Sequence, residues 1–263
     1  MKIATWNINS VRLRIGNVLR FLGEEQPDVL CLQETKSPDE FFPAEPIEAA
    51  GYRHRLISGM KGYNGVAILS RIPFEGAGSA PGWCGRADCR HAVARLRGGI
   101  EIHNLYVPAG GDVPDPAVNE KFAHKLRFLD EITQWFGEAA RHRPMVLVGD
   151  LNIAPLEHDV WSHKQLLDVV SHTPVEVEKL GALQRSAGFV DAVRHFVPAD
   201  QKLYSWWSYR NRDWNLSDRG RRLDHIWITP ELLPGLKEGA VRRDVRFWEV
   251  GSDHAPVIAV IEG

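Results

Sequence analysis

Short apolar runs alternate with amphipathic stretches along the chain, and this alternation predicts a layered α/β fold. Apolar runs typical of strands cover residues 2–8, 28–33, 65–70, 145–148, 224–229 and 256–261. Two further runs, 91–96 and 100–106, flank Gly98-Gly99 in a pattern typical of a β-hairpin. Apolar residues at helical spacing predict helices over 11–25, 117–136 and about 175–187.

The starts of two of these helices are predicted from residues that favour caps. Ser10 directly precedes the first helical pattern and suits an N-cap. Asp115-Pro116 precedes the second pattern and suits a cap followed by the first turn.

Polar residues recur at or next to the ends of the predicted strands. They are Asn7, Glu34, Tyr106, Asp150, Asn152, Asp224, Asp253 and His254. Loops at strand ends are held by a rigid sheet, and binding and catalytic residues concentrate there. We therefore expect these side chains to converge on one site.

Composition favours an ordered protein with a sizeable core. Of 263 residues, 44% are hydrophobic and 25% are charged, and we expect residues 1–263 to form a single domain. The formal net charge of -2 argues against a purely electrostatic nucleic-acid binder. Any affinity for DNA therefore needs a local basic patch and a metal ion.

Cysteine usage and the absence of targeting signals indicate a reducing compartment. The three cysteines, an odd number, do not suit a disulfide framework, and we expect Cys31 to be a core residue. The sequence shows no signal peptide and no long apolar span. We expect a cytoplasmic protein that has no membrane partner and acts as a monomer.

The residue types at the strand ends suit the cleavage of phosphodiesters. That reaction needs a divalent cation, donors for the non-bridging oxygens and a group that orients a water molecule. Carboxylates, amides and one histidine meet these needs, since Mg²⁺ prefers oxygen ligands. Each residue alone has an ordinary alternative: Asp150 as a turn residue, Glu34 as a solvated charge, and His254 as a structural histidine.

Six short motifs in a fixed order favour a catalytic site over these ordinary alternatives. They are Trp6-Asn7-Ile8-Asn9, Leu32-Gln33-Glu34-Thr35-Lys36, Tyr106-Val107-Pro108, Gly149-Asp150-Leu151-Asn152, Arg222-Leu223-Asp224-His225 and Gly251-Ser252-Asp253-His254-Ala255-Pro256. Together they resemble the exonuclease III family of apurinic/apyrimidinic endonucleases, within the deoxyribonuclease-I-like endonuclease/exonuclease/phosphatase superfamily. The resemblance covers essentially the whole chain. It implies a four-layer α/β sandwich, with two mixed β-sheets packed face to face and helices outside.

The resemblance also implies a metal site. Glu34 would be the main Mg²⁺ ligand with Asn7 close by, and Mn²⁺ can substitute for Mg²⁺. Asp253 would be a carboxylate on the metal side or hydrogen-bonded behind it. The residues placed around the metal in this way are Asn7, Glu34, Asp150, Asn152, Asp253 and His254.

Catalytic roles follow from the same resemblance. Asp150 would orient or deprotonate the attacking water, and Asn152 would donate to the scissile phosphate. Tyr106 would hydrogen-bond the phosphate. His254 would contact a non-bridging oxygen, with Asp224 holding its ring and charge state, since a histidine beside carboxylates keeps its proton.

A segment from Tyr204 to Arg222 mixes aromatic residues with arginines, which stack on bases and bind phosphates. The alternative is a buried aromatic strand followed by a solvated charged loop. We place Trp207 in the core and Trp206 at the site. The Lys61–Gly65 segment resembles a loop that reaches the DNA backbone, although a plain turn is equally compatible. The predicted DNA-binding residues are Lys61, Tyr63, Trp206, Arg210, Arg212, Arg221 and Leu223.

Two departures from the family pattern bear on substrate choice. Ala109 follows the Tyr-x-Pro motif where relatives often have an amide, and Arg221 stands where several relatives have Trp or Leu. The stretch 158–165, with Trp161 and His163, is a further candidate for tuning, or else an ordinary surface loop. These positions affect the balance between abasic-site incision and 3′-end trimming.

Three functions remain to be compared. The first is an enzyme, a DNA repair nuclease with 3′→5′ exonuclease, apurinic/apyrimidinic endonuclease and 3′-phosphatase or phosphodiesterase activity, acting on double-stranded DNA with abasic sites or blocked 3′ ends. The second is a phosphoesterase of the same fold that acts on RNA, phospholipid or inositol phosphate. The third, a non-catalytic DNA-binding protein, predicts loss of Glu34, Asp150 or His254, and all three are present.

Overall fold

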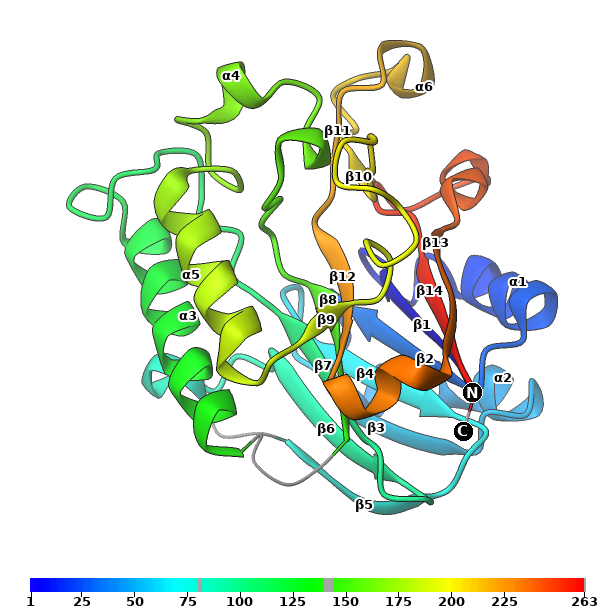
Figure 1. Cartoon of the computed structure of the whole chain (residues 1–263). Coiled ribbons are helices and arrows are strands. Elements are labelled where there is room, and N and C mark those ends of the chain that lie inside the picture. The colour runs from blue at the N-terminus through cyan, green and yellow to red at the C-terminus, as the bar shows by residue number, and fades with distance from the viewer. Residues whose placement is uncertain (80–81, 140–143, 263) are drawn as a thin grey trace.

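Two six-stranded β-sheets form the centre of the molecule (Figure 1). The computed structural model describes residues 1–79, 82–139 and 144–262. In order, the first sheet contains β13 (Leu236–Val241), β14 (Val257–Ile261), β1 (Lys2–Asn7), β2 (Val29–Gln33), β4 (Val66–Ser70) and β3 (His54–Ser58). The second contains β5 (Phe74–Ser79), β6 (His91–Leu96), β7 (Glu101–Tyr106), β8 (Met145–Asp150), β12 (Asp224–Ile228) and β9 (Val190–Asp191). A separate ribbon pairs β10 (Trp206–Trp207) with β11 (Gly220–Arg221).

Helices cover the outer faces of the two sheets. Figure 1 shows α1 (Ile15–Glu25) and α2 (Ala44–Ala49) on one side, and α3 (Glu120–Ala139) and α5 (Pro174–Ser186) on the other. The short helices α4 (His163–Leu166) and α6 (Trp214–Ser217) lie with the β10–β11 ribbon at one end of the sheets. Short 3-10 turns cover Asp39–Phe41, Trp83–Gly85, Glu157–Asp159, Pro230–Gly235 and Arg243–Phe247. Within the described residues, no helix is both long and apolar enough to cross a membrane.

The two sheets share one inner core, and this confirms the predicted four-layer sandwich. Ile3 and Ile68 of the first sheet pack with Val146 and Ile226 of the second, and all four are inaccessible to solvent. Full burial of a side chain of this size contributes about 1.5–3 kcal/mol. Separate apolar clusters lie between each sheet and its helices. Because the central strands are covered on both faces, their sequences are continuous apolar runs.

Strand directions bring the polar strand ends to one end of the sandwich. The pairs β1–β2 and β7–β8 are parallel, so Asn7 ends beside Gln33 and Tyr106 beside Asp150. Strand β12 runs antiparallel to β8, and its first residue, Asp224, lies opposite Asp150. Strand β14 runs antiparallel to β1, so the residues before Val257 reach the same end.

The first helix begins later than its sequence predicts, at Ile15 rather than at residue 11, and the expected Ser10 cap is wrong. Residues 10 and 11 instead continue along the neighbouring chain segment. The Ser10 amide donates to the Glu34 carbonyl at 2.8 Å, and the Val11 amide donates to the Thr35 carbonyl at 3.1 Å. These bonds hold the two motif-bearing loops side by side and postpone the helix by one turn.

The second helix also begins later than predicted, at Glu120, and it extends to Ala139. Asp115 ends up in a separate turn, where its carboxylate accepts from the Ala117 amide. Asn119 takes the capping place, because its side-chain oxygen accepts from the Lys121 amide at 3.1 Å. The third predicted helix is confirmed over Pro174–Ser186.

Candidate active site

A cavity of about 860 Å³ opens at the end of the sandwich where the polar strand ends meet. Its lining joins residues that lie far apart in the sequence. Polar lining residues from the strand ends are Glu34, Tyr106, Asp150, Asn152, Asp253 and His254. Aromatic, aliphatic and basic lining residues include Trp161, Val170, Trp206, Arg210, Arg219, Arg221 and Leu223.

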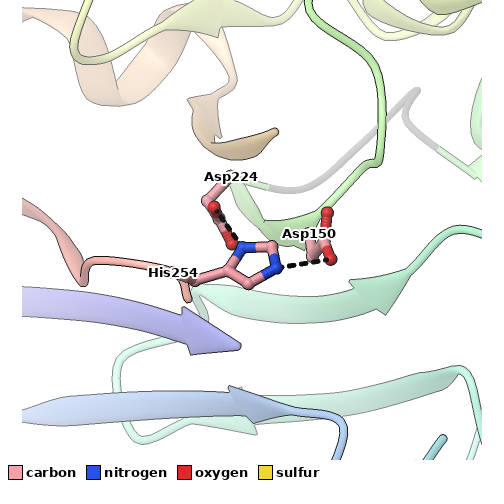
Figure 2. Close-up of side chains that lie close together, drawn as sticks. All are labelled: Asp150, Asp224 and His254. Carbon is pink, nitrogen blue, oxygen red and sulfur yellow. Dashed lines mark hydrogen bonds and ion pairs between the residues drawn. The ribbon is translucent and has the colours of Figure 1, made fainter. Parts of the chain in front are cut away.

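His254 lies between two carboxylates (Figure 2). Its Nδ1 is 2.8 Å from Asp224 Oδ2, and its Nε2 is 3.7 Å from Asp150 Oδ2. Burial opposes a charge on the ring, but the carboxylates of Asp224 and Asp150 outweigh it and raise the pKa of His254 to about 10. At neutral pH the ring is therefore an imidazolium.

Asp224 is held in place by Ser205, a residue that sequence reasoning did not select. Ser205 Oγ donates to Asp224 Oδ2 at 2.6 Å. The same hydroxyl oxygen accepts from the backbone amides of Leu223 and Asp224, each at 3.0 Å. Ser205 is fully buried. Its bonds fix the carboxylate that orients His254, and nothing in the local sequence pattern marks this role.

Asn7 connects two carboxylates at the floor of the cavity. Its buried side-chain nitrogen donates to Glu34 Oε1 and to Asp150 Oδ2, at 2.9 Å in each case. The Tyr106 hydroxyl also donates to Glu34 Oε1, at 2.8 Å. Burial favours protonation of Glu34, but the charge of Lys36 and the bond from Asn7 lower its pKa below the ordinary value. Glu34 is therefore a carboxylate at neutral pH.

The pKa of Asp150 is shifted in the opposite direction to that of Glu34. Burial raises its pKa to about 7, with His254 opposing this rise and Asp224 adding to it. The Asn152 amide donates to Oδ1 at 2.9 Å, which fixes the carboxylate plane. A carboxylate with a pKa near neutrality can both hold and accept a proton, as a general base must.

Asn152 follows β8 in a left-handed backbone conformation, with φ of 53°. Its side-chain nitrogen donates to the Val107 carbonyl at 2.8 Å and to Asp150 Oδ2 at 3.3 Å. A bond to a substrate phosphate would have to replace the longer of these two. The predicted donation from Asn152 stays a prediction.

Asp253 lies at the cavity wall rather than within the compact group around His254. Its Oδ1 accepts from Asn9 at 3.1 Å, and its Oδ2 accepts from the indole nitrogen of Trp206 at 2.9 Å. Asn9 in turn accepts from Lys36, which lies 2.7 Å from Glu34 Oε2. Asp253 thus connects the aromatic wall to the carboxylate floor, and its contact with a metal stays a prediction.

The donors at the floor fit a hard divalent cation. Ligand atoms of Asp150, Asp224 and His254 all lie within 4.8 Å of one another. However, His254 Nδ1 is occupied by Asp224, so a cation bound there would compete with the ring proton. Glu34 and Asp150 line the cavity and offer carboxylate oxygens that share one amide donor. Oxygen donors of this kind are those that Mg²⁺ prefers.

Trp206, Arg221 and Leu223 form the wall beside the floor, as the sequence predicts for a substrate-facing group. The Arg221 guanidinium lies 5.5 Å from the Trp206 ring centroid. It donates to the Val170 carbonyl at 3.0 Å and to Ser171 Oγ at 2.8 Å. These bonds attach the segment before α5 to the wall. The expected core position of Trp207 is confirmed, since it is 1% exposed, and Trp206 lines the cavity, where its contact with DNA stays a prediction.

Not every predicted DNA-binding residue reaches the cavity. Arg210 lines it, whereas Lys61, Tyr63 and Arg212 do not. Tyr63 is 71% exposed on the turn before β4. That turn borders the Glu34 loop, because the Asn64 carbonyl accepts from the Lys36 amide at 2.9 Å. Contact between these outer residues and DNA stays a prediction.

Arg222, part of one of the six motifs, faces away from the cavity into a buried ion-pair network. Its guanidinium contacts both oxygens of Asp159, at 2.8 and 3.0 Å, and Asp191 Oδ2 at 2.6 Å. Arg194 joins Asp159 from the other side. The network holds the segment before α4 against β9 and β12.

Replacing Arg222 by methionine should destabilise the fold strongly. Arg222→Met removes a guanidinium from the buried carboxylate of Asp159 and the mostly buried one of Asp191, and breaking such a pair costs about 3–5 kcal/mol. We expect a free energy of unfolding in urea that is lower by this amount. Arg20→Met, which removes an arginine from an exposed pair with Glu24, is the control and should change it by under about 1 kcal/mol. Equal effects of the two variants would contradict the structural role of Arg222.

Comparison with known proteins supports the interpretation of this geometry. The model of the endonuclease/exonuclease/phosphatase family matches residues 4–254. Exodeoxyribonuclease III of Haemophilus influenzae is 32% identical over 270 residues, covering 98% of this chain and 99% of that protein. An AP endonuclease from Archaeoglobus fulgidus superposes with a TM-score of 0.92, at 32% identity over 100% of both chains. A 3′ phosphatase from Neisseria, solved with a product DNA hairpin, superposes with a TM-score of 0.91, also at 32% identity over 100% of both chains.

Proposed function

The chain belongs to the endonuclease/exonuclease/phosphatase family and is a DNA-cleaving hydrolase, and from this premise we propose a Mg²⁺-dependent DNA repair nuclease of the exodeoxyribonuclease III type. Its substrates are duplex DNA ends, abasic sites and blocked 3′ ends. One observation carries the proposal. An imidazolium, a carboxylate with a pKa near neutrality and a second, ionised carboxylate converge on the floor of a single cavity.

Glu34 and Asp150 are the residues that would hold the cation, with Asn7 aligning their oxygens. When bound, a divalent cation supplies positive charge that stabilises the charge developing on the phosphate. Mn²⁺ offers the same oxygen-ligand chemistry as Mg²⁺ and can replace it.

The remaining catalytic roles belong to side chains of the protein. Asp150 orients a water molecule and accepts its proton, since its pKa of about 7 makes it a base at neutral pH. The His254 imidazolium donates from Nε2 to a non-bridging oxygen and stabilises its negative charge. Burial raises the pKa of Tyr106 well above its usual value, so its hydroxyl stays protonated and is a donor.

The wall of the cavity supports DNA as the substrate. Trp206 and Leu223 present apolar surface beside the catalytic floor, where a sugar that lacks its base can lie. Arg210, Arg219 and Arg221 supply the local positive charge that a net charge of -2 does not. These residues would contact the phosphates on either side of the scissile bond.

Two labelled duplexes test the function, one with a single abasic-site analogue and one with a 3′-terminal phosphate. With Mg²⁺ we expect a nick 5′ to the abasic site and release of phosphate from the blocked end. A chelator should lower both rates by at least about a hundredfold, because the cation's charge on the phosphate is lost. An intact duplex with protected 3′ ends is the control substrate. Absence of both reactions in Mg²⁺ would contradict the proposal, as would rates that the chelator leaves unchanged.

A further inference from the structure

A lysine and a glutamate form a fully buried ion pair directly behind the active site. Lys125 of α3 and Glu176 of α5 are both inaccessible to solvent, and Lys125 Nζ lies 2.5 Å from Glu176 Oε1. Neither residue lines the cavity. The function described above makes no use of the pair.

Lys125 binds the two loops that follow β7 and β8. Its Nζ donates to the Asn152 carbonyl at 2.8 Å and to the Ala109 carbonyl at 3.3 Å. The loop after β7 also packs on the lysine stem, where a Cβ added to Gly110 would lie 2.9 Å from Lys125 Cδ. Asn152 is in the left-handed region, which asparagine adopts more readily than most residues but which still needs support from its surroundings. The bond from Lys125 is one such constraint.

Glu176 binds a third loop, the one before α5. Its two oxygens accept from the Ser171 amide at 3.0 and 2.9 Å, and Oε2 also accepts from the Thr173 hydroxyl at 2.7 Å. Ser171 is the residue whose hydroxyl accepts from Arg221 at the cavity wall. The Lys125–Glu176 pair is therefore hydrogen-bonded to three loops. Each of these loops contributes residues to the cavity lining.

Stability alone is a weak reason to keep this pair. Removing two charges from water is costly, and apolar residues of similar volume in place of a buried pair are often neutral or stabilising. A functional group on loops, in contrast, needs support that fixes its geometry, and an error of about 1 Å can cost about a hundredfold in rate. The bonds of Lys125 and Glu176 end on the loops that such support must hold.

We propose that Lys125 and Glu176 are positioning residues that hold the loops at Ala109–Gly111, Asn152 and Val169–Ser171 in the geometry needed for catalysis. The role depends on the proposed function, since it concerns the same cavity. Lys125 fixes the backbone of Asn152 at the floor, and Glu176 fixes the wall through Ser171. The pair acts through these loops and does not contact the substrate.

The double variant Lys125→Met/Glu176→Gln tests this role, because it removes both charges and leaves neither one unpaired. We expect it to fold, with kcat on the abasic duplex at least about tenfold lower and KM within about threefold of the parent value. Hydrogen exchange should become faster in the three loops and stay unchanged in the central strands. Lys179→Met is the matched control, because Lys179 pairs with Asp130 between the same two helices, but Lys179 is only half-buried and Asp130 is exposed.

The outcomes separate the two hypotheses. An inactive parent protein would contradict the proposed function. An active parent with an unchanged kcat in the folded double variant would overturn the positioning role, and so would a lower kcat without faster exchange in the loops. If the double variant does not fold, Lys125→Gln/Glu176→Gln gives the same comparison, since it also removes both charges and keeps a hydrogen-bonding group at each position.

Discussion

Replacing Asp150 by asparagine should lower kcat on an abasic duplex by at least about a hundredfold, the usual cost of losing an acid–base group. The amide keeps one oxygen, which can accept from the Asn152 backbone amide, whereas its nitrogen replaces the oxygen that accepts from Asn7. It cannot accept a proton from water, and it removes one of the two carboxylates that would hold the cation. Single-turnover rates at saturating Mg²⁺ measure the loss.

The same variant should not be less stable. Because burial raises the pKa of Asp150 to about 7, the folded state favours the neutral, protonated carboxyl over the carboxylate. That contribution is complete below the unfolded pKa and is lost as the pH rises through about 7. At about pH 8 the buried charge costs stability, so we expect Asp150→Asn to have an equal or higher Tm.

Asp130→Asn on the exposed face of α3 is the matched control for this experiment. It should leave both kcat and Tm unchanged. A rate for Asp150→Asn close to that of the parent would show that Asp150 is not the base. A large fall in Tm would show that its carboxylate has a mainly structural role.

Replacing His254 by asparagine should also lower kcat by at least about a hundredfold. The variant keeps a hydrogen-bond donor but loses the positive charge at the phosphate. His195→Asn, at an exposed position, is the control and should keep the parent rate. A rate near that of the parent for His254→Asn would contradict its role in stabilising the transition state.

The charge of His254 can be tested through its partner Asp224. The two carboxylates raise the pKa of His254 to about 10, so the imidazolium should persist, and the parent rate should not fall, between about pH 7 and pH 9. In Asp224→Asn the largest favourable contribution is lost, the pKa falls, and activity should decline across the same range. Parallel pH profiles for the two proteins would contradict this assignment.

The strands in the middle of each sheet follow directly from the sequence. Strands β1, β2, β8 and β14 are buried on both faces, and this requires continuous apolar runs that stand out from the rest of the chain. The strands at the sheet edges, β3, β5, β9 and β13, carry no such runs and were not predicted. One face of an edge strand contacts little of the core, so its sequence resembles that of a loop.

In the candidate site too, the sequence predicts some residues and leaves others undetected. The sequence places Glu34, Asp150 and His254 at strand ends, because the change from apolar to polar residues marks where each strand leaves the core. It does not reveal Ser205, whose hydroxyl positions Asp224, or Lys125 and Glu176 behind Asn152. The signal for such residues is a contact between distant segments, and no local pattern records it.

By itself, the sequence determined the fold class, the inner strands and the residue types of the phosphate-cleaving centre. The tertiary structure alone decided which donors share which acceptors, and therefore which groups are charged. Asp150 and Glu34 are both strand-end carboxylates, yet burial raises the pKa of one and Lys36 lowers that of the other. Residue type sets the ordinary pKa, whereas depth in the protein and the distance to neighbouring charges set the actual one.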